Sequence, residues 1–331
     1  MLLPKQLRYR CATPRASGIL RARGGGRKAT SCSEARPGGC PRPGRPRPRS
    51  RRQSIGHGGG ALGENRSRDG WGDARTKKAG ASRKTPVVLL HGLGGSSHDW
   101  DALVPHLRGL DAVALDLPGG GKGHGAPAYD PGSLAAWLLR ALDQAGIDRA
   151  RLVGHSLGGR VAGELLAREP SRVSALVLVA PLGSAGYGFT DKLKWKAMSR
   201  RAILRNVPES KMRSALSVGF VGDGAGRKGF IDRALAARTG PKGAEVAEAI
   251  ERSVDGVLEA PPLAERLRGT RAPILLVTGE EDPLVPPREA EAILKSRPDA
   301  VAARLSGQGH YPMLEDPKGL SGTLVDFLKS V

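Results

Sequence analysis

At residues 154–158 the chain reads Gly154-His155-Ser156-Leu157-Gly158, and this stretch decides the fold. The apolar pair Leu152-Val153 precedes it and a helical pattern follows it, so the serine stands at a tight turn between a strand and a helix. Glycines two positions to either side avoid Cβ clashes where backbone crowds a strained turn. The pattern is typical of a nucleophile elbow, although an ordinary strand-to-helix turn also fits it.

An aspartate and a histidine farther along the chain favour the elbow interpretation. Asp282 follows a predicted strand at 273–278, and His310 follows another at 300–305. The carboxyl ends of parallel strands share one edge of a sheet, so both side chains can meet Ser156 there. The order serine, aspartate, histidine differs from that of the two well-known serine protease folds. The sequence therefore predicts one site built from three distant residues.

Apolar runs alternate with helical patterns from residue 85 onward, which predicts an α/β fold: a mostly parallel sheet with helices on both faces. Strands are expected at 86–90, 111–117, 151–153, 173–180, 273–278 and 300–305, and helices at 133–145, 157–167 and 320–331. Residues 182 to about 262 interrupt this alternation with helical stretches and no convincing strand. We expect these residues to form an inserted helical cap on a domain that spans residues 85–331.

One segment of the expected cap, residues 192–201, is basic with interleaved apolar residues. It reads Lys192-Leu193-Lys194-Trp195-Lys196-Ala197-Met198-Ser199-Arg200-Arg201. Such a segment fits a lid that touches lipid or an acidic substrate. It also fits a cap helix with one solvated face, because charge runs usually face water.

Residues 1–84 carry most of the formal net charge of +21. They hold 22 Lys and Arg against 4 Asp and Glu, or +18, which leaves 31 against 28, or +3, for residues 85–331. Rich in Gly, Pro and Arg and without apolar periodicity, this tail is expected to be disordered. It fits an organellar transit peptide, a nucleic-acid-binding arm, a solvated tail or upstream sequence from a mistaken start site. The folded part, being near neutral, is not expected to bind nucleic acid.

The cysteines and the hydropathy restrict the class of protein further. Cys11, Cys32 and Cys40 all lie in the tail, with spacings that match no common zinc pattern. No apolar run reaches about 18 residues, so no transmembrane helix is expected. We expect a soluble cytoplasmic protein, with organellar targeting by the tail as the alternative. The oligomeric state stays open.

Three motifs together resemble those of the α/β-hydrolase superfamily, over about three quarters of the chain. His91-Gly92-Leu93-Gly94-Gly95-Ser96 resembles the family's oxyanion loop, Asp116-Leu117-Pro118-Gly119 resembles its Asp-x-x-Gly, and Ser156-Leu157-Gly158-Gly159 fits its elbow. Within the superfamily the chain resembles the cap-bearing esterases and C–C bond hydrolases. It departs from the family before residue 85, where the usual first two strands have no apolar counterpart.

Roles for the three residues follow from their chemistry. A serine hydroxyl is a weak nucleophile, so His310 must take the proton of Ser156 and return it to the leaving group, while Asp282 orients the imidazole. The resemblance implies that the backbone N–H groups of Leu93 and Leu157 form the oxyanion hole. It implies neither a metal nor an organic cofactor.

Several other residues near these motifs could carry a function but are not expected to do so. Glu280 and Glu281 could replace Asp282 as the acid, but the spacing in the family favours Asp282, and the glutamates are expected to be solvated. The resemblance makes His91 a structural residue of the loop, and His155 is expected to be a non-catalytic pocket or packing residue beside the nucleophile. Lys122 follows three glycines but precedes another glycine instead of Ser or Thr, so we expect no nucleotide site there.

The leading hypothesis is a serine hydrolase that cleaves a small ester or related acyl compound through an acyl-Ser156 intermediate. A serine at this position excludes the branches of the family that use an aspartate nucleophile. Two alternatives stay open. One is a C–C bond hydrolase acting on a ring-fission type of metabolite, and the other is a ligand receptor that keeps the fold without turnover.

Overall fold

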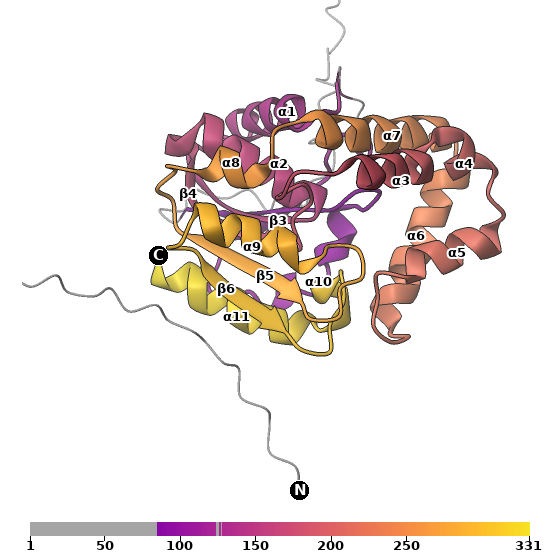
Figure 1. Cartoon of the computed structure of the whole chain (residues 1–331). Coiled ribbons are helices and arrows are strands. Elements are labelled where there is room, and N and C mark those ends of the chain that lie inside the picture. The colour runs from indigo at the N-terminus through magenta and orange to yellow at the C-terminus, as the bar shows by residue number, and fades with distance from the viewer. Residues whose placement is uncertain (1–84, 124–125, 127) are drawn as a thin grey trace, which may run out of the picture. The chain divides into compact units, whose positions relative to one another are not determined.

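The central element is a six-stranded, all-parallel sheet, seen in the computed structural model of residues 85–123, 126 and 128–331 (Figure 1). The expectations for residues 1–84 lie outside the described residues. The strand order is β2-β1-β3-β4-β5-β6, which confirms the predicted fold class. The strands are β1 (Val87–Leu90), β2 (Ala112–Leu115), β3 (Ala150–His155), β4 (Val173–Val179), β5 (Ile274–Gly279) and β6 (Val301–Leu305).

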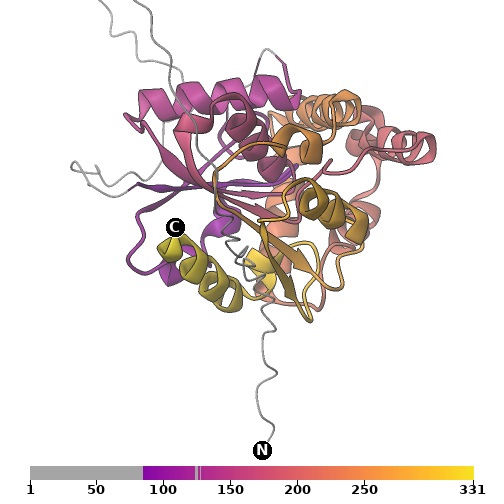
Figure 2. The same cartoon turned by 60° about the vertical axis from the view of Figure 1, so that its left-hand side comes forward.

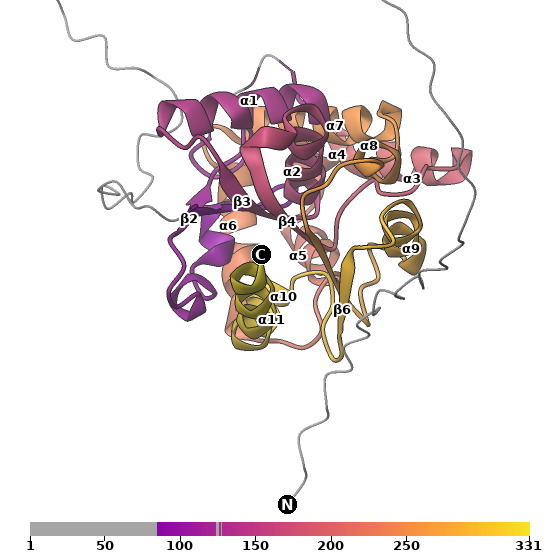
Figure 3. The ribbon, with the colours of Figure 1, turned by 90° about the vertical axis from the view of Figure 1, so that its left-hand side faces the viewer.

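Helices cover both faces of this sheet (Figures 2 and 3). One apolar cluster packs α1 (Pro131–Gln144), α2 (Leu157–Arg168), α8 (Leu263–Leu267) and α9 (Pro287–Ser296) against the face that carries Val88 and Leu152. The other packs α10 (Pro312–Glu315) and α11 (Pro317–Ser330) against the face that carries Leu89 and Val177. Short 3₁₀ helices lie at Ser97–Trp100, Val104–His106 and Pro170–Arg172. Because both faces are buried, the central strands are apolar throughout instead of alternating.

Two helices begin earlier than their apolar pattern indicates, because an aspartate caps each of them. Asp130 accepts hydrogen bonds from the backbone N–H groups of Gly132 and Ser133, at 2.9 and 3.0 Å, so α1 begins at Pro131. Asp316 accepts one from Gly319, and α11 begins at Pro317. Proline at the first helical position needs no N–H partner, which suits both starts.

Six helices lie between β4 and β5, and the described part of this stretch contains no strand. The last of them, α8, packs against the sheet, and the other five form the insertion. They are α3 (Phe189–Ser199), α4 (Arg201–Asn206), α5 (Glu209–Ser217), α6 (Ala225–Thr239) and α7 (Gly243–Glu259). Backbone hydrogen bonds join the two ends of the insertion, since Leu263 N donates to Gly183 O at 2.9 Å. The buried guanidinium of Arg160 on α2 donates to Gly183 O at 2.9 Å and to Pro261 O at 2.7 Å. Helix α2 thus holds both ends of the insertion.

None of the helices in the described residues is long and apolar enough to cross a membrane.

Candidate active site

Ser156 stands between β3 and α2 with backbone angles of φ 51° and ψ −113°. A positive φ is rare for a residue with a side chain and stores strain that the surroundings must overcome. Here the Ser156 N–H donates to Val179 O at 2.9 Å, and its carbonyl accepts from Arg160 N and Leu182 N, at 3.1 and 3.2 Å. These three hydrogen bonds hold the turn, and the residue is 5% exposed.

Glycines around this turn have a steric reason. A Cβ on Gly154 would strike the backbone of Gly158, and one on Gly158 would strike the carbonyl of Leu90. A Cβ on Gly92 would lie 2.6 Å from His155 Nδ1 and 3.2 Å from Ser156 Cβ. The elbow and the loop after β1 therefore approach each other too closely for any side chain.

Asp282 and His310 form a buried pair at the carboxyl ends of β5 and β6. His310 Nδ1 donates to Asp282 Oδ2 at 2.9 Å, and their side chains are 6% and 3% exposed. The second carboxylate oxygen, Oδ1, accepts from Leu284 N at 2.8 Å and Val285 N at 3.0 Å. With both oxygens engaged, the aspartate can hold the imidazole in only one orientation.

The serine and this pair lie at the same edge of the sheet, but the serine hydroxyl is not yet engaged. The ring of His155, next to Ser156 in the chain, lies 4.7 Å from the ring of His310 between centroids. Among the described residues, Ser156 Oγ forms no hydrogen bond with His310 or with any other group. Catalytic hydrogen bonds are often long in free enzymes and tighten when substrate binds.

The backbone around His310 is held by groups that motif reasoning missed. His310 N donates at 2.7 Å to the carbonyl oxygen of Gly219, which lies in the loop between α5 and α6. Glu315 Oε2 accepts from Gly309 N at 2.8 Å, and Glu315 Oε1 accepts from Tyr311 N at 3.0 Å. Glu315 also accepts from Val221 N at 3.3 Å. One carboxylate thus links the histidine loop to the inserted helices, and no motif in the sequence marks it.

His155 has a more specific position than the packing expected for it. Its Nε2–H donates to the backbone carbonyl of His310 at 2.9 Å, while its Nδ1 is buried with no partner among the described residues. Burial first, and then the charges of His310 and His91, place the pKa of His155 well below its usual value. His155 is therefore neutral at physiological pH and acts as a fixed donor to the loop of His310.

The loop after β1 carries His91 and Leu93. His91 Nδ1 donates to Gly92 O at 2.8 Å and its Nε2 accepts from Leu117 N at 2.9 Å, which agrees with the structural role expected of it. The Leu93 N–H has no acceptor among the described residues. Leu157 is the first residue of α2, where N–H groups lack acceptors within the helix. Both candidate oxyanion donors are thus available.

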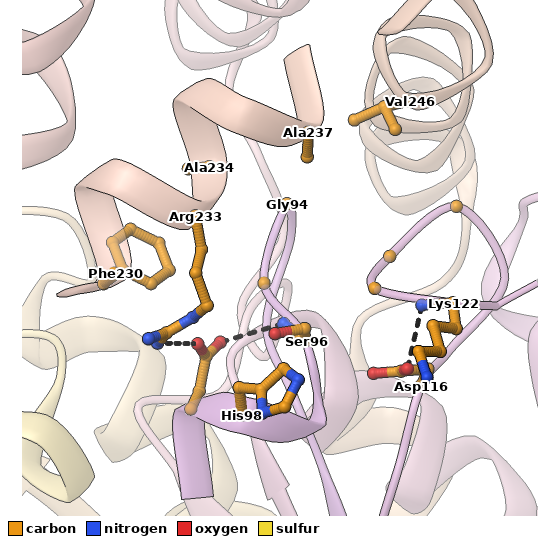
Figure 4. Close-up of a pocket in the computed structure, with 15 residues that line it drawn as sticks. Gly94, Ser96, His98, Asp116, Lys122, Phe230, Arg233, Ala234, Ala237 and Val246 are labelled. Carbon is orange, nitrogen blue, oxygen red and sulfur yellow. Dashed lines mark hydrogen bonds and ion pairs between the residues drawn. The ribbon is translucent and has the colours of Figure 1, made fainter. Parts of the chain in front are cut away.

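A cavity of about 160 Å³ lies beside this loop, between it and helices α6 and α7 (Figure 4). Neither Ser156 nor His310 lines this cavity. It therefore lies beside the candidate catalytic residues and does not contain them. Arg233, labelled in Figure 4, donates from Nη2 to Asp99 Oδ1 at 3.0 Å. The lining includes Gly94, Gly95, Asp116, Lys122, Phe230, Ala234 and Val246.

Other sequence candidates stay apart from the site. Glu280 and Glu281 are exposed, as expected of solvated residues. Backbone N–H groups of Ser97 and Lys122 bind Asp116 at 2.6 and 2.9 Å. Burial would raise the pKa of Asp116, but these bonds outweigh it and hold that pKa below its usual value. Within the described residues no three His, Cys, Asp or Glu side chains are grouped to hold a metal ion.

Comparison with known proteins places the chain among hydrolases. Residues 85–317 match the family model described as "alpha/beta hydrolase fold". The chain is 31% identical to a pimeloyl-[acyl-carrier protein] methyl ester esterase of Aromatoleum aromaticum, over 73% of the chain and 98% of the relative. It is 28% identical, over 76% of its length, to a dihydrolipoyllysine-residue acetyltransferase component of the acetoin cleaving system of Cupriavidus necator, and the match spans 65% of that protein.

A solved structure gives the same fold. The 2-hydroxy-6-oxo-6-phenylhexa-2,4-dienoate hydrolase of Rhodococcus sp. strain RHA1 superposes with a TM-score of 0.64 at 22% identity. The alignment covers 74% of this chain and 91% of the other.

Proposed function

The chain belongs to the α/β-hydrolase fold family and is an enzyme of that class, and we propose that it is a serine hydrolase of small esters or related acyl compounds. The observation that carries this proposal is the buried hydrogen bond between His310 and Asp282 at the sheet edge where Ser156 stands on a strained turn. Similarity to a relative named as a methyl ester esterase supports cleavage of an ester.

The proposed reaction begins with attack of Ser156 Oγ on the substrate carbonyl. His310 Nε2 takes the serine proton, because Nδ1 is committed to Asp282, and then returns it to the departing alcohol. Water, activated in turn by His310, releases the acid from the acyl-serine. The first step needs a movement that brings the hydroxyl and the imidazole into hydrogen-bond contact, since that bond is not made in the free protein.

Charge on the substrate oxygen is proposed to be held by Leu93 N–H and Leu157 N–H. Loss of one such donor typically costs about 3 kcal/mol of transition-state stabilisation. Because the donors belong to the backbone, side-chain substitution at these two positions is expected to change the shape of the site more than the stabilisation of charge.

We further propose that the inserted helices α3 to α7 act as the cap predicted for residues 182–262. Three contacts support this role: Gly219 O accepts from His310 N, and the rings of Phe220 and Phe230 lie 4.2 and 4.8 Å from that of Tyr311. The insertion therefore covers the histidine side of the site. The cavity beside Gly94 and Gly95 is a candidate for the part of the substrate farthest from the reacting carbonyl.

The test uses chromogenic esters of increasing acyl length with the wild type, Ser156→Ala and the control Ser214→Ala. Ser214 is an exposed serine on α5 whose hydroxyl donates only to Ser210 O. We expect Ser156→Ala to abolish turnover and labelling by a fluorophosphonate, and Ser214→Ala to retain both. Equal ester hydrolysis by wild type and Ser156→Ala would refute the mechanism.

The same experiment separates the alternatives. A dienone of the ring-fission type is included among the substrates. Turnover of that compound without ester hydrolysis would assign C–C bond cleavage. A serine that no fluorophosphonate labels, in a protein that binds but does not turn over these compounds, would assign a receptor.

A further inference from the structure

Helix α3 has its apolar residues on the outside. Phe189 is 83% exposed, Leu193 62% and Met198 52%. Successive residues of an α-helix turn by about 100°, so Phe189, Leu193 and Ala197 lie in one row, while Met198 lies farther round the helix, beyond Lys194. We call Phe189, Leu193 and Ala197 the α3 face. Ile203 of α4, 45% exposed, is also apolar and exposed.

The side of α3 that carries Asp191, Trp195 and Ser199 faces the protein, and Lys196, at the margin of the exposed row, reaches back to α7. Lys196 Nζ lies 3.8 Å from Asp255 and 3.6 Å from Glu259, both on α7 (Figure 1). Asp191 accepts a hydrogen bond from Arg288 at 2.7 Å. The helix is therefore fixed by charged contacts, with only Trp195 packed against the main apolar cluster. This is the reverse of a helix that covers a core, where the apolar stripe faces inward.

Lysines border the α3 face on both sides. On the same helical projection, Lys194 lies on one side of the apolar row and Lys192 and Lys196 lie on the other. Residues 189–206 contain six Lys and Arg and one Asp, a net of +5. Lys192 and Lys194 form no ion pair with any described residue. An apolar row between basic borders is the pattern of a helix that lies in a membrane interface, with lysine stems extended toward headgroups.

We propose that the α3 face is a docking surface for an anionic lipid bilayer. The two large apolar side chains of this face, Phe189 and Leu193, favour the hydrocarbon boundary, and the basic borders favour acidic headgroups. A second copy of this chain fits less well, because it would bring one positive face against another. An acidic soluble protein would match the charge but not the exposed phenylalanine and leucine. Docking of this kind is independent of the proposed hydrolase chemistry.

The test is flotation of the full chain with vesicles of phosphatidylglycerol and phosphatidylcholine in equal parts, and with pure phosphatidylcholine vesicles. The test variant is Phe189→Ser/Leu193→Ser. The matched control is Val301→Ser/Val331→Ser, which removes two apolar residues that are each 43% exposed and lie outside the insertion. All proteins keep residues 1–84, so attraction by that basic segment is the same in each. Unfolding midpoints are compared to show that both variants fold.

We expect the test variant to lose about tenfold or more in partition to the anionic vesicles, because burial of each of these side chains contributes more than one factor of ten. The control should bind like the wild type. A second variant, Lys192→Glu/Lys194→Glu, should weaken binding mainly at low salt.

Two results would overturn the proposal. One is binding to anionic vesicles that the Phe189→Ser/Leu193→Ser variant retains in full, which would place the contact elsewhere in the chain. The other is absence of vesicle binding by the wild type, including the case in which the α3 face instead joins two copies in solution.

Discussion

Replacement of Glu315 by alanine tests whether the loop of His310 is positioned by a single carboxylate. Glu315 accepts from the N–H groups on either side of His310, those of Gly309 and Tyr311, at 2.8 and 3.0 Å. The substitution removes both acceptors at once. It leaves the side chains of the proposed triad untouched.

The magnitude follows from these two bonds. Hydrogen bonds to charged groups contribute about 1.5 to 3 kcal/mol each, and the half-buried position of Glu315 favours the lower figure because water replaces part of the loss. We therefore expect the free energy of unfolding to fall by about 2 to 3 kcal/mol. If the same free energy is lost from the transition state of the reaction, kcat falls by about 30- to 150-fold.

The assay compares kcat and the unfolding free energy of Glu315→Ala and Glu315→Gln with those of Glu291→Ala. Glu291 is an exposed glutamate on α9 and serves as the control. Glutamine keeps one acceptor oxygen, so its losses should be intermediate. A stability loss with unchanged kcat in folded enzyme would show that Glu315 supports only the fold, and unchanged values of both would refute the reasoning.

Three further substitutions test the site and its surroundings. Gly92→Ala places a Cβ 2.6 Å from His155 Nδ1, so kcat should fall by about tenfold or more and the urea midpoint should fall as well; full activity would mean that the loop shifts freely. Ala234→Leu narrows the cavity of Figure 4 and should lower kcat/KM for long acyl esters more than for short ones; an equal loss across the series would place the substrate elsewhere. Burial raises the pKa of Glu289 above its usual 4.5, despite the bonds it accepts from Ala185 N and Ser184 N. The native state then holds this proton more tightly than the unfolded state. The contribution of this proton to the free energy of unfolding is therefore fully present below about pH 4.5, and it is lost as the pH rises through the raised pKa of Glu289. Glu289→Gln should flatten that decline in urea titrations at several pH values, and an unaltered slope would contradict the assignment.

The strand pattern could be predicted because buried parallel strands are short apolar runs. All six strands fall within or beside the predicted ranges, but β3 runs to His155 instead of ending at Val153. Gly154 and His155 remain paired with Leu178 and Val179 of β4. A glycine usually indicates the end of a strand, and here the sheet pairing overrides that preference.

The site could be predicted only in part, for a physical reason. Asp282 and His310 directly follow their strands, so topology alone brings them to one edge. Glu315 and Gly219 act through backbone groups of the histidine loop, and such contacts depend on how separately folded segments pack. Arg160 also binds backbone carbonyls, which any residue supplies, so no residue pattern signals it.

The hydrogen bond between Leu263 N and Gly183 O has a consequence for how this protein could diversify. The insertion begins and ends at neighbouring points beside the sheet. Its length can therefore change without changing the distance between β4 and β5. An insertion of different length could replace residues between Gly183 and Leu263 while the sheet and the candidate site residues at its edge keep their positions. Recognition and chemistry could then evolve as exchangeable parts.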